Sequence, residues 1–149
     1  CSIGDTSCRG CDIIIVMNQF NFTHTSTPPA LLPILQKAKS AYLLWYQYYT
    51  IIPKTHRYSL GQKIDNFFVN AIEGITTAGF LNKEEKLPYV RLARRKIDTL
   101  KIFLMMLWET KSLDDKKYIA LSLKIDELGK MLGGWQGQLV KQTRPKLSG

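Results

Sequence analysis

The chain has 149 residues, of which 45% are hydrophobic and 22% are charged, a balance that excludes a disordered protein and suits one globular domain. Lysine and arginine number 21 against 12 aspartates and glutamates, which gives a net charge of +9. This surplus favours a polyanionic partner such as nucleic acid, an acidic protein or a membrane surface, and a basic surface without a dedicated partner explains it equally well.

No segment of the sequence is apolar enough to cross a membrane. The longest uninterrupted apolar run, residues 102–108, has seven residues, whereas a spanning helix needs about twenty. The apolar stretch at residues 13–17 lacks the basic start and the length of a secretory signal. We therefore expect a cytoplasmic protein with no membrane partner.

Cysteine and histidine are too sparse to predict a metal site or an enzyme. Cys8-x-x-Cys11 is half of a zinc site, but His24 is the only further ligand nearby. Neither His24 nor His56 follows a glutamate at the spacing that a di-metal bundle requires. No glycine-rich phosphate loop opens a helix. We expect no catalytic residue, no metal and no cofactor.

The N-terminal 29 residues differ in character from the rest of the chain. All three cysteines lie within residues 1–16, and the first methionine is Met17. We interpret Met17 as the candidate start and residues 1–16 as non-native. The polar, threonine-rich stretch that ends at Pro29 completes a flexible arm over residues 1–29.

Residues 30–140 predict a domain of four amphipathic helices. Apolar residues recur at alternating steps of three and four, which places each set along one side of a helix. These apolar seams cover residues 31–52, 60–78, 90–107 and 118–135. Because the connections are short, the helices form an all-α, antiparallel up-down-up-down four-helix bundle.

Local signals predict where the helices begin and end. Two capping boxes, Ser59 with Gln62 and Ser112 with Asp115, indicate the starts of the second and fourth helices. The pair Gly133-Gly134 indicates a stop for the fourth helix, with a helical continuation to residue 140 left open. Residues 141–149 are polar and basic, and we expect a disordered tail there.

Basic residues of the third helix form the best candidate binding site. Arg91, Arg94, Arg95 and Lys101 lie beside the apolar seam within three turns, interrupted by Asp98. This spacing projects several cations from one side, as binding to a phosphate backbone requires. Asp98 is four residues after Arg94 and three before Lys101, so we expect it to neutralise part of this charge within the helix.

Three further cations are candidates for the same site, and a solvated helix face is the alternative. The candidates are Arg57, Lys63 and Lys130. The sequence alone does not establish whether they share a face with the cations of the third helix.

Three segments of this sequence closely resemble the Avd (accessory variability determinant) family, the four-helix-bundle accessory proteins of diversity-generating retroelements. They are residues 57–65 (RYSLGQKID), 95–101 (RKIDTLK) and, most specifically, 128–135 (LGKMLGGW). The resemblance covers about residues 32–135. The four-helix proteins encoded in ribosomal-RNA intervening sequences share the fold and are the nearest alternative, although the Arg-Tyr-Ser-Leu-Gly-Gln block favours Avd.

The resemblance implies a function without an active site. Avd-family proteins form a basic homopentameric barrel that associates with the reverse transcriptase of the element and its template RNA, or with cDNA or an RNA–DNA hybrid, in the synthesis of mutagenised cDNA (mutagenic retrohoming). Lys101 and Lys130 match basic family positions. Met105 stands where some members carry another arginine, so the basic stripe is expected to be narrower here.

A pentamer also gives a purpose to apolar side chains that we expect to point outward from a single bundle. They are Tyr46, Phe68, Ile102, Phe103 and Met106. The rival from another functional class is a purely structural oligomeric bundle with no role in nucleic-acid binding.

Overall fold

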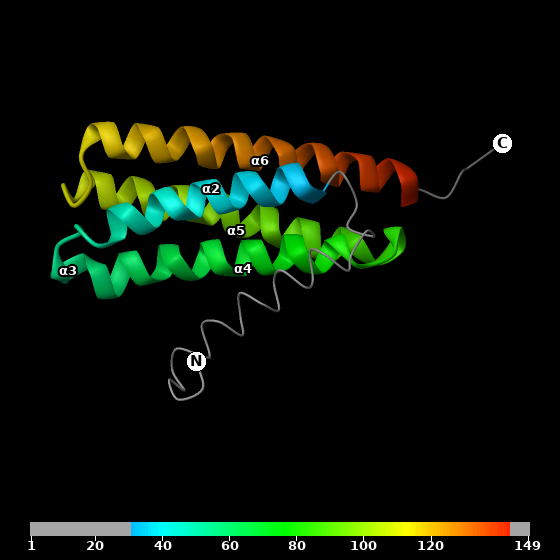
Figure 1. The fold of residues 1–149 in the computed structure, drawn as a ribbon, viewed down its shortest axis with the longest axis horizontal. Coiled ribbons are helices and arrows are strands. Elements are labelled where there is room, and N and C mark those ends of the chain that lie inside the picture. Colours follow the sequence, from blue (N-terminus) through cyan, green and yellow to red (C-terminus); the bar gives the residue numbers. More distant parts are fainter. Residues whose placement is uncertain (1–30, 144–149) are drawn as a thin grey trace, which may run out of the picture.

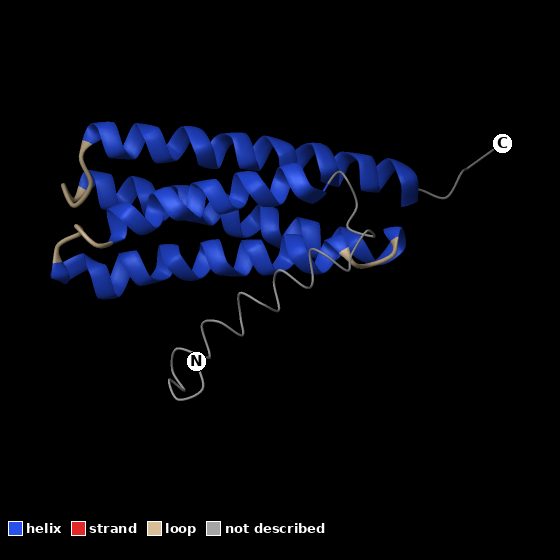
Figure 2. Cartoon of the chain, viewed as in Figure 1, coloured by secondary structure: helices blue, strands red, loops and turns tan. Residues whose placement is uncertain are grey.

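Four long helices make up most of the computed structural model, which describes residues 31–143. They are α2 (Leu31–Tyr49), α4 (Gln62–Gly79), α5 (Lys83–Glu109) and α6 (Asp115–Thr143). The short helix α3 (Lys54–His56) and the π-helical turn η1 (Arg57–Gly61) lead directly into α4. The part of the chain that the structure describes contains no strand (Figure 2), and the predicted all-α four-helix bundle is confirmed.

The helices pack as the four sides of an antiparallel bundle (Figure 1). Helix α2 contacts α4 and α6, and α5 contacts the same two helices from the opposite side. The α2–α3 and α5–α6 connections lie at one end of the bundle, and the α4–α5 connection lies at the other. This order follows from the short connections, which force each helix to run back along its predecessor.

Two helix starts differ from the predicted capping boxes. Ser59 lies inside η1, where its hydroxyl donates to the carbonyl of Thr55 at 3.3 Å, so it caps nothing. Asp114 caps α6 instead, because its Oδ1 accepts from the backbone N–H of Lys117 at 2.8 Å. The Lys117 side chain donates to the same carboxyl and lowers the pKa of Asp114. Ser112 is engaged elsewhere: its hydroxyl lies 2.6 Å from Nδ1 of His56 and joins two turns at one end of the bundle.

Helix α6 does not stop at Gly133-Gly134, and the helical continuation that the sequence left open is the one observed. It continues to Thr143, three residues beyond the predicted domain boundary. The described glycines all have negative φ angles, so the left-handed conformation that a glycine helix stop needs is not adopted here. The predicted arm, including Cys8, Cys11 and His24, and the predicted tail from residue 144 onward lie outside the described residues.

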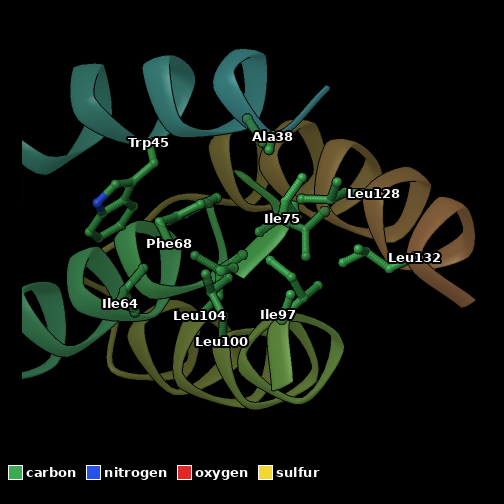
Figure 3. Packing of buried hydrophobic residues seen from close by; sticks show 14 of the residues in the cluster. Ala38, Trp45, Ile64, Phe68, Ile75, Ile97, Leu100, Leu104, Leu128 and Leu132 are labelled. Atoms are coloured by element: carbon green, nitrogen blue, oxygen red, sulfur yellow. The ribbon is translucent and has the colours of Figure 1, made fainter. Parts of the chain in front are cut away.

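The predicted seams supply most of the core, which also includes buried residues outside them, such as Ile34, Ala41 and Leu139. All six seam residues of α5, from Val90 to Leu107, are buried, and Figure 3 shows Ile97, Leu100 and Leu104 directed at side chains from the other helices. Phe68 was expected to point outward and is fully buried, with its ring stacked 6.3 Å from that of Trp45. Phe68 stands four residues after Ile64 and three before Ala71, which are both buried, so it lies on the same inward face of α4.

Polar contacts hold α2 against its two neighbours. Trp45 Nε1 donates to Asp65 on α4 at 3.3 Å, while burial and the nearby Asp65 carboxylate raise the pKa of Tyr42 to about 12. On the other side, Lys37 Nζ lies 2.7 Å from Glu127 of α6, and this hydrogen bond lowers the pKa of that carboxyl. These contacts join α2 to both of its neighbouring helices.

Within residues 31–143, no helix is both long and apolar enough to span a bilayer.

We predict that Phe68→Ala lowers the free energy of unfolding by about 3–5 kcal/mol, because it removes a fully buried aromatic ring and leaves a cavity. Urea denaturation monitored by circular dichroism measures this. The neighbouring exposed Val69 provides the control, since Val69→Ala should change the same quantity by less than about 0.5 kcal/mol. Equal losses from both variants would mean that Phe68 points outward, as the sequence suggested.

Candidate functional site

The candidate site lies where the cations of α5 meet the face of α6. Burial of Val90, Ala93, Ile97 and Leu100 fixes the rotation of α5. The neighbouring positions of the helix, Arg91, Arg94, Arg95 and Lys101, therefore emerge beside the seam, within reach of α6.

Lys101 lies across α6 and does not extend freely into solvent. Its Nζ is 2.9 Å from Oδ1 of Asp126, with 37% and 54% of the two side chains exposed. Gly129 makes room for this path: a Cβ at that position would stand 3.3 Å from the Lys101 Nζ. Because Gly129 has no side chain, the Lys101 ammonium can lie directly against α6 at this position.

Arg94 follows the same pattern one helical turn further along α6. Its Nη1 donates to Oε1 of Gln136 at 3.2 Å, and its guanidinium carbon lies 3.6 Å from the place where Gly133 would carry a Cβ. Gly129 and Gly133 are four residues apart and so share one face of the helix. Together they form a furrow in which two α5 cations lie.

Two shallow cavities of about 230 Å³ each open along this furrow. They share Arg94 and Asp98. The first is also lined by Lys101, Asp126, Gly129, Lys130 and Gly133. The second is also lined by Arg91, Arg95 and Gln136.

We call the charged residues of both cavities the cationic surface. It contains five cations, Arg91, Arg94, Arg95, Lys101 and Lys130, and two carboxylates, Asp98 and Asp126, which leaves a surplus of three positive charges. Guanidinium and ammonium groups bind phosphate through charge-assisted hydrogen bonds. The arrangement is therefore chemically suited to a polyanion.

Two of the seven predicted site residues lie elsewhere. The Arg57 guanidinium donates to the backbone carbonyls of Ile52, at 2.9 and 3.1 Å, and of Thr50, at 2.9 Å. It thus satisfies carbonyl groups at the end of α2, a structural role. Lys63 is exposed on α4 and lines neither cavity.

Within α5, Asp98 forms no ion pair with Arg94 or Lys101. Arg94 and Lys101 turn instead to Gln136 and Asp126 of α6, because the furrow offers them partners across the helix interface. Sequence reasoning also missed Gln136, Gly129 and Gly133. The spacing of the two glycines was a usable signal, since residues four apart on a helix share a face.

The described residues show no group of histidine, cysteine, aspartate and glutamate side chains that could hold a metal ion. Cys8, Cys11 and His24 lie outside them, so the half zinc site considered from the sequence has no structural description.

A family model described as bAvd-like matches residues 32–139. The chain belongs to the bAvd-like family. This confirms the resemblance to the Avd accessory variability determinant proteins, an accessory and non-catalytic type. The matched span contains every residue of the cationic surface. No curated protein and no solved structure matches the chain.

We predict that Gly134→Ala raises the free energy of unfolding by about 0.5–1 kcal/mol. The added Cβ meets nothing within 4 Å, and alanine lowers the backbone entropy that a helix interior loses on folding. Gly129→Ala should gain less, because its Cβ displaces the Lys101 ammonium. Urea denaturation of the two variants gives the comparison. A destabilising Gly134→Ala would show that α6 ends at the glycine pair.

Proposed function

We propose that this chain is a non-catalytic accessory protein of a diversity-generating retroelement. It binds the reverse transcriptase of the element and its template RNA through the cationic surface, and so supports mutagenic cDNA synthesis. Membership of the bAvd-like family is the observation that carries this proposal. The cationic surface supplies the physical means, since it gathers five cations at one helix interface.

The cationic surface is suited to phosphate because its cations are already positioned but not consumed by strong internal pairs. Arg94 is held by a neutral amide, and the Lys101–Asp126 pair is partly exposed, so it contributes only about 0–1 kcal/mol. Arg91, Arg95 and Lys130 are exposed at the rims of the cavities. An RNA phosphate can therefore engage these groups at little cost to the fold.

A homopentameric ring is the assembly that we propose. Ile102 and Met106 on α5 are 54% and 40% exposed, and Tyr46 on α2 is 56% exposed. Exposed apolar side chains that lie together mark interaction surfaces. Phe103 belongs to this group only in part, because its ring packs 5.3 Å from that of Phe67. Ile102 and Met106 are one turn apart on α5 and form the apolar strip that we assign to the contact between subunits.

We predict that Arg94→Ala/Lys101→Ala weakens binding to single-stranded RNA and reduces its salt dependence. Each phosphate neutralised on a single strand contributes about 0.7 to the slope of log K against log salt, so the loss of two contacts should reduce the slope by about 1.4 per chain. Fluorescence anisotropy over a salt series measures this, and co-purification reports binding to the cognate reverse transcriptase.

The matched control removes two exposed cations outside the cationic surface. Lys39→Ala/Lys54→Ala produces the same change in net charge on α2 and α3 and should leave affinity and slope nearly unchanged. Equal effects of the two double variants would mean that net charge, and not this surface, determines binding. No affinity of the wild-type protein for RNA or the polymerase at low salt would favour a purely structural bundle.

We predict that Ile102→Glu/Met106→Glu dissociates the pentamer into folded single chains, because burying two carboxylates in a subunit contact without partners is costly. Light scattering after size exclusion measures the particle mass, and circular dichroism reports the fold. Gln138→Glu/Gln142→Glu places the same charges four residues apart on exposed positions of α6 and should leave the mass unchanged. A wild-type particle with the mass of one chain would refute the ring.

A further inference from the structure

The Asp98 carboxylate is surrounded by cations and yet has no partner among the described residues. Neither an ion pair nor a hydrogen bond engages it. Its own helix offers Arg94 four residues earlier and Lys101 three residues later, but these side chains bind Gln136 and Asp126. Asp98 thus keeps a free acceptor at a position where the protein supplies none of the donors.

Asp98 also occupies a particular place along the furrow, because it lines both cavities. Each cavity is bordered by cations and suits a phosphate. Phosphates and sugars alternate along a nucleic-acid strand. A strand that places one phosphate in each cavity therefore carries a sugar across the wall that the cavities share, where Asp98 lies.

The charge of the surroundings selects the kind of donor that reaches Asp98. The surplus of three positive charges on the cationic surface repels a metal ion or a cationic side chain of a partner. A neutral hydroxyl experiences no such repulsion. The 2′-hydroxyl of ribose is a neutral donor that DNA lacks, and its hydrogen bond to a carboxylate is charge-assisted and short.

We propose that Asp98 accepts a hydrogen bond from a ribose 2′-hydroxyl and makes the cationic surface selective for RNA over single-stranded DNA. This inference rests on the proposed function, since it requires that the surface binds the template RNA. Asp126 has a different role. It holds the Lys101 ammonium beside Gly129 and makes no contact with the ribose.

The test compares three single strands of one sequence on the full chain: RNA, DNA, and RNA with fluorine in place of each 2′-hydroxyl. The fluorinated strand keeps the RNA-like sugar shape but has no hydrogen to donate. We expect the wild-type protein to bind RNA about tenfold more tightly than the fluorinated strand, the ratio that one hydrogen bond to a charged group supplies. DNA should bind no better than the fluorinated strand.

Two variants with the same change in charge separate recognition from electrostatics. Asp98→Ala should tighten DNA and fluorinated RNA while reducing the tenfold preference to about twofold or less. Asp126→Ala should tighten all three strands alike and keep the preference. Both positions are exposed on helix surfaces, and the comparison of ligands on the wild-type protein needs no variant to fold.

Equal affinity of the wild-type protein for RNA and the fluorinated strand would overturn the inference, as would equal loss of preference in both variants. These outcomes leave the proposed function standing, because polyanion binding through Arg94 and Lys101 persists in them. Failure of the wild-type protein to bind any strand at low salt would instead remove the proposed function and this inference with it.

Discussion

Burial of the apolar seam of α5 between α4 and α6 is the constraint on which the rest of the structure depends. The seam fixes which side of α5 faces inward, since residues at steps of three and four share one face. Once Ala93, Ile97 and Leu100 are buried, Arg94 and Lys101 can emerge only at the edge of the interface with α6. The packing of the core thus sets the position of the cations without any direct contribution from them.

Two glycines of α6, Gly129 and Gly133, let the cations of α5 lie close against the surface of α6. A Cβ at Gly129 would crowd the Lys101 ammonium at 3.3 Å, whereas a Cβ at Gly133 would only touch the Arg94 guanidinium at 3.6 Å. Glycine in a helix interior costs about 0.5–1 kcal/mol relative to alanine. The helix also carries Gly134 and Gly137, whose added Cβ atoms would meet nothing within 4 Å, so close packing explains only Gly129.

The sequence predicts the fold well because its signals are periodic. Seams such as Val90 to Leu107 define a buried face over many turns, and Ile64, Ile97 and Ile125, which lie within three of the predicted seams, are all buried. Single-residue signals fail where tertiary contacts compete. Ser112 was predicted to cap a helix, but a hydrogen bond to His56 occupies its hydroxyl. Gly133-Gly134 indicated a helix stop, but neither glycine adopts a positive φ and α6 continues to Thr143.

The cations that α5 contributes to the site were predictable from the sequence, but their partners on α6 were not, for a related reason. Spacing along α5 identifies Arg91, Arg94, Arg95 and Lys101 as neighbours, but it cannot show which partner each side chain takes from another helix. The intrahelical rule assigned Asp98 to Arg94 or Lys101. Such pairs are worth only about 0.2–0.5 kcal/mol, so partners of similar strength on α6, a carboxylate and an amide, can replace them. Arg57 shows the same limit. Its charge predicted a contact with nucleic acid, but its guanidinium donates hydrogen bonds to the backbone carbonyls of Thr50 and Ile52. Charge spacing therefore locates a surface, and only the packing of neighbouring helices decides which of its charges stay free to bind.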